Sequence, residues 1–347
     1  MKKSQMLIIL IIFSVQWIVM AKEMVEEKNL DLVYYLALDG NVKAAMEKLN
    51  SIDPAILNPT ELETRKKYLA RFGKNHIVGV RKNGALKDEL ISIFQEYWDN
   101  VLLQKLTQEE GYHFLFERLT PVVKRLGGAI DKFSEKEYDR VAAFLTKRLK
   151  DQGYFAQIGG VSPHLNLMIW RTEKTKTYRV DLGNGHIQKV DVVLMSGFES
   201  LGWAAYATFD KLYIGGWVGE NLLYCVSSAY DLKSENFKVS FLAHEARHFA
   251  DKKDFPKLKS VDLEYRAKLN ELMLADKSFE SLFRKFLLEQ KENPNNPHSY
   301  ASFQIIRNLS KKLSKSISLE SVTSVDKKMV QKFSAELLKE HTAKLGQ

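Results

Sequence analysis

The sequence predicts an α+β fold, in which an all-helical N-terminal part precedes a part with a small, mostly antiparallel sheet and further helices. Three observations support this prediction. Apolar residues recur at helical spacing from residue 29 to about 150, short runs rich in β-branched and aromatic residues fill residues 154–226, and helical spacing returns after residue 236. The chain of 347 residues is about twice the length of a typical domain, so we expect two folded units.

The first 21 residues have the pattern of an export signal. Lys2 and Lys3 precede an apolar run over residues 6–20, and the small residue Ala21 follows. This order is typical of a secretory signal peptide and predicts cleavage after Ala21 and an exported protein, periplasmic or secreted. If the leader is retained, it would anchor the chain in a membrane, because the run approaches the roughly 18 residues that span a bilayer.

Residues 22–150 are expected to form a helical domain. Apolar side chains in residues 90–102 recur on one helix face, and three hydroxyl residues each precede a glutamate by three positions, as in a capping box at a helix start. The apolar stripe is Leu90, Ile93, Phe94, Tyr97, Trp98, Val101 and Leu102, and the candidate boxes are Thr60/Glu63, Thr107/Glu110 and Ser134/Glu137. We expect about six helices, with a break at residues 39–41 between the first two.

Residues 151–347 are expected to form a second domain with both strands and helices. The candidate strands are residues 165–170, 177–181, 189–195, 204–209, 211–214 and 222–226. Asn184-Gly185 lies between the second and third of these and indicates a hairpin turn, because both residue types tolerate positive φ. The segment after residue 236 is predicted to be helical.

Charge and cysteine content limit the partners and the metal chemistry. The formal charge falls from +9 to +7 when Lys2 and Lys3 leave with the leader. Solvated surface faces are the preferred interpretation of these charges, and the alternative is a weak association with an anionic envelope surface rather than with nucleic acid. Cys225 is the only cysteine, so the chain has no internal disulfide and no four-cysteine metal site. A metal ion would therefore be held by His, Asp or Glu, and Cys225 itself is expected to be a core thiol.

The segment that carries chemistry contains His244, Glu245 and His248. On a helix the two histidines lie one turn apart on the same face, so both imidazoles can bind one ion, with Glu245 beside them. This is the H-E-x-x-H arrangement of zinc hydrolases, and it predicts Zn²⁺ as the cofactor. The flanking residues are mostly apolar and predict a buried helix, where these polar groups would be costly to desolvate without a metal.

A catalytic zinc site needs a third protein ligand, and Glu264 is the candidate on the next predicted helix. With this residue the sequence resembles the gluzincin metallopeptidases, the thermolysin-like group, over about thirty residues. The resemblance implies that His244, His248 and Glu264 bind zinc, that Glu245 acts as general base, and that the substrate is a peptide or protein.

Other acidic residues remain open as the third ligand. Asp262 and Glu271 lie on the same predicted helix as Glu264. Asp254 lies six residues after His248, where metzincin-type enzymes place their third ligand, but those enzymes need a glycine at the position of Asp251. Asp251 is expected instead to accept a hydrogen bond from a ligand histidine, because it shares their helix face.

Four further features have two interpretations each. His298 and Tyr300 follow an Asn/Pro-rich loop and could stabilise a developing oxyanion, or be a loop histidine and a helix-start aromatic. Arg247, a charge inside the motif, is expected at a cleft rim or paired with an acid. Residues 215–217 could form a strand edge to which a peptide adds, or a turn.

These patterns together predict an exported, zinc-dependent peptidase that uses a metal-activated water and a glutamate base. The alternative is a non-catalytic envelope scaffold or binding module whose zinc site is structural or vestigial.

Overall fold

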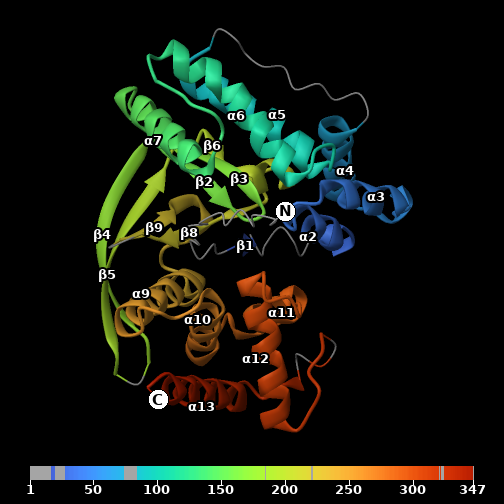
Figure 1. Ribbon diagram of the computed structural model, residues 1–347. Helices are drawn as coiled ribbons and strands as arrows, with labels where there is room; N and C mark the ends of the chain where they lie inside the picture. Colours follow the sequence, from blue (N-terminus) through green and yellow to red (C-terminus); the bar gives the residue numbers. More distant parts are fainter. Residues whose placement is uncertain are drawn as a thin grey trace, which may run out of the picture. The chain divides into compact units, whose positions relative to one another are not determined.

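The computed structural model describes residues 17–19, 28–73, 84–183, 185–219, 222–319, 321 and 324–346. The described chain has a mixed α+β fold with helical N- and C-terminal parts, which confirms the predicted fold class. It forms two compact units (Figure 1). Within the described ranges, the first contains Trp17–Glu173 and Met195–Ile214, and the second contains Lys174–Leu194 and Gly215–Gln347. The predicted leader lies outside the described residues except for residues 17–19, which form strand β1.

The first unit contains the six helices that were expected before residue 151. They are α2 (Asp31–Leu38), α3 (Val42–Ser51), α4 (Pro59–Phe72), α5 (Leu86–Leu102), α6 (Gln108–Arg125) and α7 (Glu135–Asp151), with the short 3-10 helices η1 (Lys28–Leu30) and η2 (Pro54–Ile56). The apolar stripe of α5 is buried throughout, and Thr107 and Glu110 form the predicted capping box of α6. The box of α4 is Asn58/Glu61 instead of Thr60/Glu63, because Pro59 already occupies the first helical position.

The first unit also contains strands that the sequence placed after its boundary at residue 150. The hairpin β2 (Phe155–Val161) and β3 (His164–Trp170) packs on α5, where Trp98 Nε1 donates to the Leu165 carbonyl over 2.9 Å. The Leu165 amide in turn donates to the hydroxyl of Tyr97 over 3.1 Å. Strand β6 (Ser200–Leu201) pairs with β3, and β7 (Leu212–Ile214) pairs with β1.

One predicted strand is wrong. Residues 204–209 were expected to be extended, but Trp203–Thr208 forms helix α8. Three of its six residues are alanine, the best helix former, and Thr208 Oγ1 donates to the Ala204 carbonyl one turn earlier over 2.8 Å. All six side chains are buried, so packing favours the helix over the local strand pattern.

The second unit is built on a four-stranded sheet in the order β4-β5-β9-β8. Its strands are β4 (Thr172–Asp181), β5 (Ile187–Ser196), β8 (Gly216–Val218) and β9 (Leu223–Val226), and the 3-10 helix η3 (Ser227–Ala229) follows. Strands β8 and β9 are antiparallel, with Gly216 opposite Cys225. Cys225 is fully buried, as expected.

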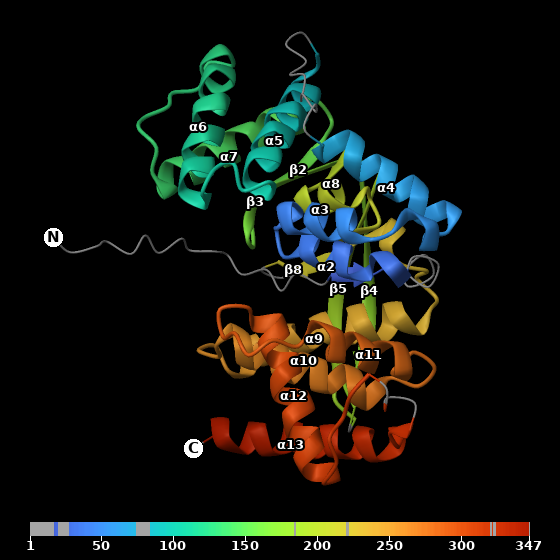
Figure 2. The same cartoon turned by 90° about the vertical axis from the view of Figure 1, so that its right-hand side faces the viewer.

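Helices form the rest of the second unit (Figure 2). They are the π-helix η4 (Phe237–Ala243), α9 (His244–Asp254), α10 (Ser260–Leu274), α11 (Phe279–Glu289), α12 (Pro297–Leu313) and α13 (Lys327–Leu345). Helix α10 lies at the centre, in contact with α9, α12 and α13, and its residues Tyr265, Leu269 and Leu272 belong to the main apolar core. Within the described ranges, no helix is both long and apolar enough to cross a bilayer.

Candidate metal centre

Helix α9 presents the two histidines of the motif to one point in the interior. It continues directly from the π-helix η4, and both His244 and His248 are 1% exposed. Their Nε2 atoms are 3.0 Å apart. Two ring nitrogens at this distance share one proton or bind one cation, since two lone pairs facing each other would repel.

Helix α10 brings Glu264 to the same point. Its Oε2 lies 3.5 Å from Nε2 of His244, and its Oε1 lies 3.3 Å from Nε2 of His248. Ligands about 2.0–2.2 Å from a tetrahedral zinc lie about 3.3–3.5 Å from one another, close to the three separations in this cluster. The three ligand atoms lie within 4.8 Å of one another. In the described part of the chain, these three residues form the cluster of potential ligand side chains that could hold a metal ion. The cluster therefore fits a zinc ion in spacing and in donor type.

Glu271, two turns along α10 from Glu264, holds His244 in place. Its Oε1 lies 2.5 Å from Nδ1 of His244, and both side chains are nearly inaccessible to solvent. A carboxylate on Nδ1 fixes the ring so that Nε2 remains available for a metal, an arrangement common among zinc-binding histidines. Glu271, one of the alternative third ligands, therefore lies beside the cluster as the partner of a ligand.

The charges in the cluster stabilise one another. Burial would lower the pKa of His244, but the carboxylates of Glu271 and Glu264 outweigh burial and raise that pKa to about 10. Burial lowers the pKa of His248, and Glu264 offsets this only in part. Burial would raise the pKa of Glu264, yet the neighbouring histidines His298, His248 and His244 hold it well below its usual value. Glu264 is therefore ionised, as a metal ligand must be.

Glu245 lies next to the first histidine and is fully buried. Glu245 lies near Cys225 of strand β9. The pKa of the Cys225 thiol is raised, mainly because the thiol is buried and to a smaller extent because of the charge of Glu245. A buried carboxylate next in sequence to a ligand histidine is a candidate proton acceptor.

His298 is brought to the cluster by the first turn of α12. Its Nδ1 lies 3.0 Å from Oε2 of Glu264, its ring is parallel to that of His244 at 6.4 Å, and its side chain is 21% exposed. Burial lowers the pKa of His298 to about 4, so the ring is neutral near pH 7. His298 therefore lies against a ligand carboxylate, and its predicted role in stabilising an oxyanion stays a prediction.

Tyr300 is not brought to the cluster by any described contact. Its ring stacks on Phe303 at 6.0 Å, one turn further along α12. The prediction that Tyr300 stabilises an oxyanion stays a prediction.

Asp262 and Asp254 lie away from the cluster. Oδ1 of Asp262 is 3.4 Å from Nε2 of His341 on α13, and Asp254 is exposed at the end of α9. Among the four candidate third ligands, Glu264 is the one that the structure places within reach of both histidines.

The prediction for Asp251 is wrong. Its two oxygens accept from Nε and Nη2 of Arg266 over 2.8 and 2.9 Å, and both side chains are buried. The guanidinium of Arg266, on α10, therefore binds Asp251 in place of the ligand histidine that was expected there. Arg247 does pair with an acid, as one interpretation held, since its Nη1 lies 3.9 Å from Asp251.

A second ion pair, between a buried lysine and a half-buried glutamate, was missed by the sequence analysis. Lys268 on α10 binds Glu289 on α11, and Ser302 on α12 donates to the same carboxylate over 2.6 Å. Ser302 lies one turn beyond His298, so this pair ties the start of α12 to the helix that carries Glu264. The partners are far apart in the sequence, and no local spacing indicated them.

The class of site is thus a buried His/His/Glu cluster that could hold a metal ion, with a glutamate beside it. Comparison of the chain with protein-family models, with curated proteins and with solved structures found no match. The case for function therefore rests on the geometry of this cluster.

Proposed function

We propose that this protein is a zinc-dependent peptidase. The observation that carries the proposal is the cluster of His244, His248 and Glu264, whose ligand atoms lie 3.0–3.5 Å apart with Glu245 adjacent on the same helix. Three protein ligands leave one tetrahedral position open, as in catalytic zinc sites, whereas structural sites usually have four.

The residues of the chain would divide the chemistry among them. A bound zinc ion would supply a Lewis acid for a carbonyl oxygen and would acidify a water molecule. Glu245 would accept a proton from that water and pass it to the leaving amine. Glu271 would orient His244 and His298 would orient Glu264, so that the ligand atoms are held before substrate binds.

Strand β8 contains part of the segment that was considered as an edge to which a peptide could add. Among the described strands it is an edge of its sheet, paired only with β9, and it packs against α9. A Cβ atom at Gly216 would lie 2.3 Å from the ring of Phe241 and from the Tyr224 carbonyl, so a glycine is needed for this close packing. All three β8 residues are buried, so an extended peptide could add to this edge through main-chain hydrogen bonds only where the strand becomes exposed.

One observation favours the rival, a structural zinc site in a scaffold or binding module. The three ligands and Glu245 are all 0–3% exposed, and His298 is the more exposed side chain beside them. A structural site would be buried in this way, but a catalytic site also excludes bulk water while a substrate is bound. The two functions differ in their dependence on Glu245.

Hydrolysis of a mixed peptide library by the purified chain tests the proposal. The measurement compares the wild type with Glu245→Gln, which keeps the shape of the side chain but removes the proton acceptor. We expect cleavage by the wild type, loss of cleavage with a zinc chelator, and a decrease on the order of 10² to 10⁴ in Glu245→Gln. A zinc-loaded wild type that cleaves no peptide, or a Glu245→Gln variant as active as the wild type, would refute it.

A further inference from the structure

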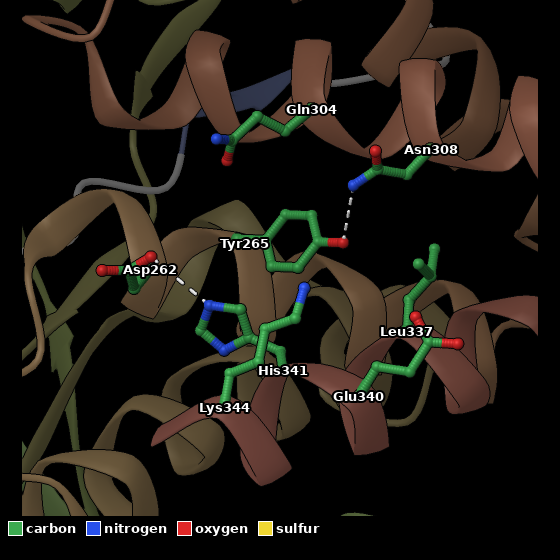
Figure 3. Close-up of a pocket in the computed structure, with 8 residues that line it drawn as sticks. All are labelled: Asp262, Tyr265, Gln304, Asn308, Leu337, Glu340, His341 and Lys344. Atoms are coloured by element: carbon green, nitrogen blue, oxygen red, sulfur yellow. Dashed lines mark hydrogen bonds and ion pairs between the residues drawn. The ribbon is translucent and has the colours of Figure 1, made fainter. Parts of the chain in front are cut away.

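A separate pocket lies in the second unit, and its lining includes none of the metal-cluster residues (Figure 3). Its volume is about 220 Å³, and it is lined by residues of α10, α12 and α13. The lining residues are Asp262, Tyr265, Gln304, Asn308, Leu337, Glu340, His341 and Lys344. The pocket is smaller than the usual 300–1,000 Å³ of drug-sized sites, so it has room only for a small molecule.

The pocket offers one acceptor for a cation. Asp262 lies at one end in Figure 3, with a side chain that is 35% exposed. Its neighbour His341 does not cancel its charge, because burial lowers the pKa of His341 and leaves the ring neutral. The other acid, Glu340, is already neutralised by Lys312, whose Nζ is 2.9 Å away.

The pocket also offers one cation and two amides. Lys344 extends from α13 into the pocket, and within the described part of the chain its ammonium makes no ion pair. Asn308 donates to the hydroxyl of Tyr265 over 3.0 Å, so its amide oxygen can accept from a ligand. Tyr265 and Leu337, which are 6% and 7% exposed, add a small apolar surface.

We propose that this pocket binds a small zwitterion, an α-amino acid with an apolar side chain. Its ammonium group would bind Asp262, its carboxylate would bind Lys344, and its side chain would pack against Tyr265 and Leu337. Each charged hydrogen bond contributes more than a neutral one, and the two opposite charges select a ligand that carries both. The site is independent of zinc and of the proposed peptidase activity.

Titration calorimetry of the purified full chain with L-phenylalanine tests the proposal. Two blocked probes separate the two ends of the ligand: N-acetyl-L-phenylalanine lacks the ammonium, and L-phenylalanine amide lacks the carboxylate. The dipeptide Phe-Ala tests whether the site takes the end of a peptide instead of a free amino acid. We expect saturable binding of L-phenylalanine and about tenfold or more weaker binding of the other three. Equal or tighter binding of either blocked probe or of the dipeptide would overturn the assignment.

Variants then locate the binding site. Asp262→Asn and Lys344→Met should each weaken the binding of L-phenylalanine about tenfold or more. Lys339→Met, which changes an exposed lysine of α13 outside the pocket, is the matched control and should leave the affinity unchanged. Circular dichroism of each variant establishes that it is folded. The absence of saturable binding by the folded wild type, or unchanged affinity in a folded Lys344→Met variant, would contradict the proposal.

Discussion

Nδ1 of His244 lies 2.5 Å from Oε1 of Glu271, and both side chains are buried. Donation from Nδ1–H leaves Nε2 of the same ring as the atom that faces His248 and Glu264. Glu264 and Glu271 are seven residues apart on α10 and lie on the same helix face, so one helix supplies both a ligand and the partner of another ligand.

The first prediction concerns this pair. Glu271→Ala should weaken zinc binding about 10- to 100-fold, because His244 loses the group that orients it. Glu271→Gln should cost less, since its amide oxygen still accepts from Nδ1. The measurement is zinc affinity in competition with a chelating dye, with Glu292→Ala in an exposed loop as the control. Unchanged affinity in Glu271→Ala would show that His244 does not need this partner.

The identity of the third ligand is tested by three alanine variants. Glu264→Ala should lose zinc at neutral pH, because a site with two histidines binds the ion much more weakly than one with three ligands. Asp254→Ala and Asp262→Ala should keep zinc, since Asp254 is exposed and Asp262 lies beside His341. If Asp254→Ala lost the metal and Glu264→Ala kept it, the ligands would follow the metzincin-like spacing instead.

Substitution of His298 distinguishes between two roles for this residue, through its effects on zinc affinity and on peptide hydrolysis. If it positions Glu264, His298→Ala should weaken zinc binding and slow peptide hydrolysis together, by up to about tenfold in zinc affinity. If it stabilises an oxyanion, the same variant should keep its zinc affinity and lose turnover alone. We expect the first result, because Nδ1 lies 3.0 Å from Glu264. Lys311→Ala, at an exposed lysine in the last turn of α12, is the control and should change neither quantity.

The parts of the site set by local sequence could be predicted, and the parts set by helix crossing could not. The four-residue spacing of His244 and His248 determines that they share a face wherever the helix lies. The partner of His244 depends on how α10 crosses α9, so Glu271 could be proposed only as an alternative ligand. Asp251 was assigned to a histidine because no local pattern indicated that Arg266, fifteen residues later, reaches it.

The same distinction applies to the fold. Helices α2 to α7 follow from apolar periodicity and capping residues, which are local signals. The domain boundary expected at residue 150 does not follow from such signals, because Trp98 and Tyr97 bind Leu165 nearly seventy residues away. Helix α8 was mistaken for a strand because its aromatic residues outweighed its alanines in a short window.

The lowered pKa of Glu235 leads to a prediction of how the free energy of unfolding depends on pH. Burial would raise its pKa, but hydrogen bonds from the amides of Asp276, Lys277 and Ser278 and from the Ser278 hydroxyl lower it to about 2. Because the folded pKa lies below the unfolded value of about 4.3, this stabilisation is present above pH 4.3 and is lost as pH falls through 2.

The test is urea unfolding of the wild type and Glu235→Gln between pH 7 and pH 2. At pH 7 the variant should be less stable by about 1 kcal/mol, a value reduced for solvent screening, and the difference should shrink in acid. Glu280→Gln, at an exposed glutamate in the first turn of α11, is the matched control and should change stability by only about 0.3–0.5 kcal/mol, the value of its exposed pair with Arg284. A difference that stayed constant down to pH 2 would show that the Glu235 charge is not responsible.

The metal content of the purified protein tests the central claim most directly. The measurement is zinc per chain by mass spectrometry of the elements, made on the wild type, Glu245→Gln and His248→Ala after the same purification. We predict about one zinc per chain in the wild type and in Glu245→Gln, and less than about a tenth of that in His248→Ala, which lacks a ligand. A wild type that takes up no zinc, or a folded His248→Ala variant that keeps as much zinc as the wild type, would contradict the account.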